Sequence, residues 1–193
     1  MGTPFATVYN RFLGKITDDM YLELTPEDTI KDLRNLLIDA IPGFEFPRKV
    51  LSDYAIDTQI KPESQLSAED FMIGVVWGDL DDELGVDPDV FVEASSFNCD
   101  LSSEEINILA ILMMSAWLQR QITSIENIRM KYSGSDFKMT SQANHLAKLL
   151  SLSKEVHRQS HHMQRLYKRR KIVDGGQYES NWSVLRTNSA IDD

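Results

Sequence analysis

The spacing of hydrophobic residues predicts two helices in the first part of the chain. Apolar residues recur every three or four positions from Thr3 to Gly14, where the glycine is a typical stop signal. A second helix is expected from Thr25, which is followed by Pro26 in the first helical position, to the stop at Pro42 and the glycine after it. Both segments carry an apolar stripe suited to packing against a core.

The helical period is lost between residues 44 and 97, where prolines and glycines recur and an acidic run begins at Asp79. We interpret this region as an acidic insertion with short strands. The strand candidates are residues 71–77, 90–93 and 97–99, with a hairpin predicted across residues 94–96.

Two capping boxes predict separate helices after the insertion. Ser102 with Glu105 starts a third helix that is apolar over most of its circumference. Thr123 with Glu126 repeats the signal and predicts a short fourth helix.

A long final helix is predicted over residues 136–172, followed by an extended tail. Its apolar stripe is strong as far as Val156 and sparse afterwards. Because a helix rises about 1.5 Å per residue, this one would reach roughly 50 Å. We therefore expect its second half to project from the domain or to pack on another chain.

The predicted fold is mainly α: a helical bundle with one long C-terminal helix, an acidic insertion with short strands, and an extended C-terminal tail. The expected organisation is N-terminal core helices over residues 1–46, the insertion with a possible β-hairpin over 47–100, core helices and the long helix over 101–172, and the tail over 173–193.

The charge of the chain is divided between two regions of opposite sign. Residues 1–105 hold 7 Lys and Arg against 23 Asp and Glu, whereas residues 106–193 hold 13 against 7. The two parts therefore carry net charges of −16 and +6. Such a distribution can orient subunits head to tail or direct one end toward an acidic partner, although an acidic region also serves solubility alone.

The composition is that of a soluble globular protein, with 42% hydrophobic and 26% charged residues. No uninterrupted apolar run has the length that a membrane-spanning helix needs, and the first residues lack the pattern of a signal peptide. We therefore expect a cytosolic protein with no membrane partner.

The sequence offers little support for catalysis or for a metal. His157 and His161 are four residues apart and could share a metal on one helical face, but Arg158 stands where the zinc-protease motif has glutamate. The acidic run lacks the EF-hand spacing, and Cys99 has no nearby histidine. With no phosphate-binding glycine loop or nucleophile elbow, we expect no enzyme and no cofactor.

A cluster of cations at the end of the long helix is the sharpest electrostatic feature. It can neutralise nucleic-acid phosphates, dock into an acidic groove on a partner protein, or remain a solvated helix end. The cluster, called the basic end below, consists of Arg165, Lys168, Arg169, Arg170 and Lys171.

Several short runs of the sequence resemble runs that occur in the same order in a family of tailed-bacteriophage neck proteins. The runs are LSSEEINILA from Leu101, MMSAWL from Met113, SIENI from Ser124, SDFKMTSQANHL from Ser135, VYNRFLGKITD from Val8, and AIPGF from Ala40. Two segments look longer than the family pattern, namely residues 50–93 and the tail after Ile172.

The resemblance implies a head completion or head-to-tail adaptor subunit. Such a subunit forms a homo-oligomeric ring of about twelve copies beneath the portal, in the virion neck, and packaged DNA passes nearby without specific recognition. Its expected partners are the portal protein and a tail-side neck or tail completion protein, and it assembles in the host cytoplasm.

We expect the basic end to contact the portal together with the tail residues Tyr178, Trp182 and Leu185. The acidic residues Asp79, Asp81, Asp82 and Glu83 are expected to face the channel or the tail-side partner. An alternative is a small DNA-binding or packaging accessory protein that uses the basic end. A regulatory coiled-coil module is disfavoured because heptad spacing fades in the second half of the long helix.

Overall fold

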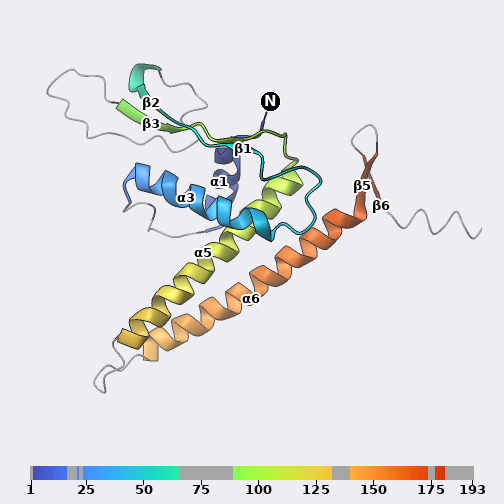
Figure 1. Cartoon of the computed structure of the whole chain (residues 1–193). Helices are drawn as coiled ribbons and strands as arrows, with labels where there is room; N and C mark the ends of the chain where they lie inside the picture. The colour runs from blue at the N-terminus through green and yellow to red at the C-terminus, as the bar shows by residue number, and fades with distance from the viewer. Residues whose placement is uncertain are drawn as a thin grey trace, which may run out of the picture.

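The computed structural model describes residues 2–16, 21, 24–65, 89–131, 140–173 and 177–180. Its principal helices are α1 (Phe5–Leu13), α3 (Pro26–Ala40), α5 (Ser103–Lys131) and α6 (Thr140–Arg169). Helices α5 and α6 form an antiparallel hairpin, and α1 and α3 pack against the first half of α5 (Figure 1). The mainly helical fold with a long C-terminal helix is thus confirmed.

The starts of α3 and α5 follow the predicted capping residues. Thr25 Oγ1 accepts a hydrogen bond from the Asp28 N–H at 3.2 Å at the start of α3. At the start of α5, Glu105 Oε2 accepts the Ser102 N–H at 2.7 Å, and Ser102 Oγ accepts the Glu105 N–H at 3.3 Å. Each pair satisfies amide groups that a helix start leaves without an intrahelical partner.

The main core lies where α1, α3, the first half of α5 and the last turns of α6 meet. Its fully buried side chains include Phe5, Phe12, Leu36, Leu109 and Tyr167. Burying one such large apolar side chain contributes about 1.5–3 kcal/mol, so this junction dominates the stability of the body. The 3₁₀ turn η1 (Ile41–Gly43) continues directly from α3 and delivers Phe44 into the same core.

Within the described residues, the strands form three separate antiparallel pairs. β1 (Tyr54–Ala55) pairs with β4 (Ser96–Phe97), β2 (Thr58–Pro62) pairs with β3 (Asp89–Glu93), and a short 3₁₀ turn, η2 (Glu63–Gln65), follows β2. Strands were correctly expected near residues 90–93 and 97–99, but the hairpin across residues 94–96 is wrong. The chain runs straight on there, because the Ala94 N–H donates to the Asp57 carbonyl at 3.0 Å and keeps both strands paired to the earlier segment. Residues 71–77 lie outside the described part of the chain.

The predicted short fourth helix is also wrong, because α5 is continuous from Ser103 to Lys131. Thr123, which was interpreted as a cap, donates its hydroxyl to the Gln119 carbonyl at 2.9 Å, one turn back in the same helix. This bond satisfies the hydroxyl without interrupting the helix.

By length and composition, residues 103–127 could cross a membrane, a test that core helices of soluble proteins also pass.

Helix α6 packs on α5 through a seam whose positions alternate in steps of three and four residues. Every seam residue is buried or half-buried, and the spacing is that of a heptad repeat. The heptad spacing therefore persists to the end of α6, contrary to our expectation. The apolar pattern of the sequence did not reveal it because serine occupies two of the seam positions. The seam consists of Leu146, Leu149, Ser153, Val156, Ser160, Met163 and Tyr167.

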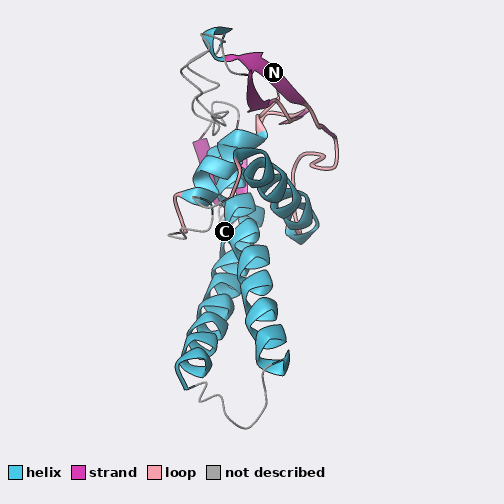
Figure 2. Cartoon of the chain, turned by 90° about the vertical axis from the view of Figure 1, so that its left-hand side faces the viewer, coloured by secondary structure: helices cyan, strands magenta, loops and turns pink. Residues whose placement is uncertain are grey.

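The half of α6 that extends away from the body is the first half, not the second as predicted. Figure 2 shows the two helices of the hairpin running together beyond α1 and α3. In the extending half, Leu150 and Leu152 remain 40% and 41% exposed. The second half ends in the main core, where Gln164 and Tyr167 are 1% exposed.

The long helix ends at Arg169, earlier than predicted, and the chain continues as a strand pair. β5 (Arg170–Val173) pairs with β6 (Gln177–Ser180), and Ile172 lies opposite Tyr178. Part of the expected extended tail is therefore a β-hairpin. Residues 181–193 lie outside the described part of the chain.

Candidate partner-binding surface

A buried hydrogen bond and the arginine Arg48 join the end of α6, which carries the basic end, to the body. The Tyr167 hydroxyl donates to Glu105 Oε1 at 2.5 Å. The Arg48 guanidinium lies 4.3 Å from the centre of the Tyr167 ring and donates to the Tyr167 carbonyl at 2.7 Å and to the Arg170 carbonyl. Because the last carbonyls of a helix lack intrahelical partners, Arg48 acts as a C-terminal cap for α6.

The Glu105–Tyr167 contact shifts the pKa values of both groups. Burial, followed by the hydrogen bond to Glu105, raises the pKa of Tyr167 strongly. Burial also opposes ionisation of Glu105, but the hydrogen bonds from Tyr167 and Ser102 outweigh it, so the pKa of Glu105 lies below its usual value. At neutral pH the contact therefore joins a neutral phenol to a carboxylate, which is a strong charge-assisted hydrogen bond.

The five predicted cations are not equivalent in the structure. Arg170 Nη1 donates to Glu104 Oε1 at 2.9 Å, and Lys168 Nζ lies 4.0 Å from the centre of the Phe46 ring. Arg165 and Arg169 are exposed and form no ion pair with any described residue. These two side chains are therefore exposed to solvent on the last turns of α6.

The remaining predicted site residues lie either in the C-terminal strand pair or outside the described part of the chain. The backbones of Lys171 and Tyr178 lie in β5 and β6, where Lys171 is opposite Glu179. The other predicted residues lie outside the described part of the chain: Trp182, Leu185, Asp79, Asp81, Asp82 and Glu83.

Sequence reasoning missed Arg48, which contacts the basic end from the loop after η1 and is followed in the sequence by Lys49. The two positive charges are adjacent in the sequence, but nothing in their spacing relates them to a helix that ends about 120 residues later. The only local signal is the unusual pair of cations within the acidic part of the chain.

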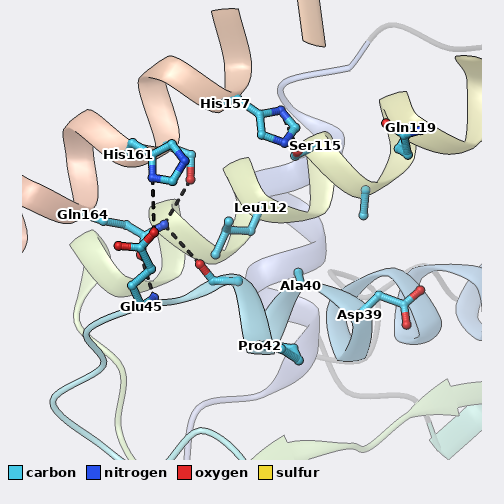
Figure 3. A pocket seen from close by; sticks show the side chains of 13 residues that line it. Asp39, Ala40, Pro42, Glu45, Leu112, Ser115, Gln119, His157, His161 and Gln164 are labelled. Carbon is cyan, nitrogen blue, oxygen red and sulfur yellow. Dashed lines mark hydrogen bonds and ion pairs between the residues drawn. The ribbon is translucent and has the colours of Figure 1, made fainter. Parts of the chain in front are cut away.

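A cleft of about 490 Å³ lies between η1, the middle of α5 and the middle of α6. Figure 3 shows His157 beside Ser115 and His161 beside Glu45 at its wall. The Ser115 hydroxyl lies 3.2 Å from His157 Nδ1, and His161 Nδ1 lies 3.3 Å from Glu45 Oε1. The two histidines therefore contact different partners instead of converging on one point.

Buried Gln164 closes the floor of the cleft. Its Oε1 accepts the Glu45 N–H at 2.7 Å, and its Nε2 donates to the Gly43 carbonyl and to Ser160 Oγ, each at 3.2 Å. Within the described ranges, no group of three or more His, Cys, Asp or Glu side chains is placed to hold a metal ion. The polar groups of Gln164 are thus all used in hydrogen bonds that join α6 to η1 and to the residues after it.

Comparison with known proteins gives no relative. No protein-family model, no curated protein and no solved structure matches the chain at a significant level.

Proposed function

We propose that the chain is a non-enzymatic structural adaptor of a tailed-bacteriophage neck. Copies of it form a ring that joins the portal to the tail and continues the DNA channel. The sequence resemblance supplies the class of assembly, and the observation that supports docking is the basic end. Arg165 and Arg169 are exposed there on a helix terminus that Arg48 and the Glu105–Tyr167 bond hold in place.

A fixed pair of cations suits docking into an acidic groove. Because the helix end is held in place, its backbone loses little freedom on binding, and the exposed cations steer association with a surface of opposite sign. The adjacent strand pair β5–β6 adds a second element beside these cations. In the proposal, this end of the molecule meets the portal.

The first experiment is native mass spectrometry of the purified chain, alone and mixed with the portal protein encoded by the same genome. A closed ring, or a monomer that joins portal rings in fixed stoichiometry, supports the adaptor. A monomer that ignores the portal contradicts it.

The role of the basic end is tested by R165S/R169S, which should abolish incorporation into portal complexes while the chain remains folded. The matched control is K148S/K154S, because it removes the same charge from exposed positions of α6 outside the basic end. Incorporation of R165S/R169S at the wild-type level would contradict this role.

The acidic residues are assigned in the proposal to the channel or to the tail-side partner. Carboxylates along a channel repel DNA and limit its adhesion. Replacing Asp79, Asp81 and Asp82 with Asn and Glu83 with Gln should therefore slow DNA release or impair tail joining. Phage particles that carry the replacements and retain normal release and tail joining would contradict the assignment.

A further inference from the structure

The side of α6 that faces away from α5 is basic along most of its length. Because the seam fixes which side of the helix contacts α5, the remaining heptad positions fall on the outer side. All six cations of α6 lie there and are exposed. Glu155 is the one carboxylate of α6 itself, and Glu45, from the loop after η1, approaches this side at His161. We call this surface the outer face, and its cations are Lys148, Lys154, Arg158, Arg165, Lys168 and Arg169.

Most of this charge is not neutralised within the described parts of the chain. Arg158 Nη2 lies 2.5 Å from Glu155 Oε1, and Lys168 lies over the Phe46 ring. The other four cations make no ion pair with a described residue. The chain as a whole has a net charge of −10, so the charge of the outer face is opposite in sign to that of the whole protein.

Outside the basic end, the chemistry of the outer face favours a phosphate backbone over a protein partner. Stable protein interfaces centre on buried apolar or aromatic side chains. The positions between the cations hold Ala147, Ser151, His161 and His162, with no large apolar side chain. Leu150 and Leu152 border the seam, one on each side, and so lie at the margins of the outer face.

The dimensions of the outer face also match a nucleic-acid duplex. Lys148 and Arg169 are 21 positions apart, which places them about 32 Å apart along the helix axis. This length is close to one turn of B-form DNA, roughly 34–36 Å. Charges spread over a rigid helix can contact successive phosphates without reading bases.

We propose that the outer face of α6 binds the phosphate backbone of duplex nucleic acid without sequence recognition. The proposal goes beyond the adaptor function because it requires neither a ring nor a portal. It also differs from binding by the basic end alone, because Lys148, Lys154 and Arg158 lie in other turns of α6.

The test is fluorescence anisotropy of a labelled duplex of about 30 base pairs, titrated with the chain across a range of salt concentrations. Each phosphate contact contributes about 0.9 to the slope of log affinity against log salt, so four cations give a slope near −3.6. The variant K148S/K154S should reduce the magnitude of this slope by about 2. The variant E155Q, which removes the carboxylate next to Arg158, should bind more tightly.

The matched control is R11S/K31S, which removes the same charge from α1 and α3 and should leave the slope unchanged. A wild-type chain that does not bind the duplex at low salt overturns the proposal. So does a K148S/K154S variant with the wild-type slope, or an equal loss in R11S/K31S. Binding of a polyglutamate peptide without binding of the duplex would assign the outer face to an acidic protein instead.

The outcome is separable from that of the adaptor proposal. K148S/K154S should lose affinity for DNA and still join the portal, whereas R165S/R169S should lose both. Failure of duplex binding therefore leaves the portal experiment intact, and failure of portal binding leaves the outer face intact.

Discussion

The Tyr167 hydroxyl donates a 2.5 Å hydrogen bond to the Glu105 carboxylate, joining the last turn of α6 to the first turn of α5. Both side chains are buried, with exposures of 1% and 3%. The second oxygen of the same carboxylate accepts hydrogen bonds from the N–H and the hydroxyl of Ser102. One glutamate therefore caps α5 and also fixes the end of α6 from which the basic end is presented.

Breaking this contact should destabilise the body. Glu105→Gln and Tyr167→Phe are each expected to lower the free energy of unfolding by about 1–3 kcal/mol, since each leaves a buried polar group with a weaker partner or none. In urea unfolding the double variant should lose less than the sum of the single losses. A coupling energy below about 0.5 kcal/mol would contradict the contact.

The same contact predicts how stability depends on pH. The pKa of Glu105 is lowered from its usual value of 4.5, so the folded state favours the charged carboxylate. Its contribution is fully present above the unfolded pKa of about 4.5 and is lost as the pH falls through the lower folded pKa. The difference in unfolding free energy between wild type and Glu105→Gln should therefore be constant from about pH 6 to 7 and shrink below about pH 4.5. A difference that stays constant down to pH 3 would exclude the shift.

A buried ion pair should matter more than an exposed one. Arg34 Nη2 lies 2.8 Å from Glu93 Oε2, and the Glu93 side chain is fully buried where β3 meets α3. Glu93→Leu leaves the guanidinium without its carboxylate and should cost about 3–5 kcal/mol, whereas R34M/E93L should lose less.

The control for this ion pair is Glu27→Gln, at the exposed pair with Lys31. It should leave the urea midpoint unchanged within error. If Glu93→Leu were as mild as Glu27→Gln, the Arg34–Glu93 pair would not anchor the strands.

Two leucines one turn apart on α6 should respond differently to truncation. Leu146 is 7% exposed in the seam, whereas Leu150 is 40% exposed. Leu146→Ala should cost about 2–3 kcal/mol and Leu150→Ala less than about 1 kcal/mol in urea unfolding. Equal losses would show that another surface covers Leu150 in solution, and the loss for Leu150→Ala should then depend on protein concentration.

Local signals explain which parts of the fold could be predicted. Thr25 and Ser102 mark helix starts because a capping interaction involves residues only three positions apart. Thr123 carries the same local pattern, yet neighbouring apolar residues keep α5 helical through it. A capping signal is thus local information that the surrounding helix can override.

Non-local pairing explains most of what could not be predicted. Ser153 and Ser160 conceal the seam of α6 in the sequence because buried positions are usually recognised by apolar side chains. Arg48 and Glu105 are surface-type residues by composition, and only the folded structure brings both to Tyr167. Each cation of the outer face can be read from the sequence. That they share one side of α6 follows only once the position of the seam is known.

The position of Gln164 has a consequence for the order in which the chain can fold during synthesis. The ribosome delivers Gly43 and Glu45 early, but their hydrogen-bonding partner arrives 121 and 119 residues later. Until then α1 and α3 can pack on α5, but the part of the core filled by Met163 and Tyr167 is missing, and contacts of such high sequence separation form slowly. The nascent chain should therefore remain protease-sensitive until α6 emerges, and truncation before residue 164 should yield a product that needs a chaperone to stay soluble.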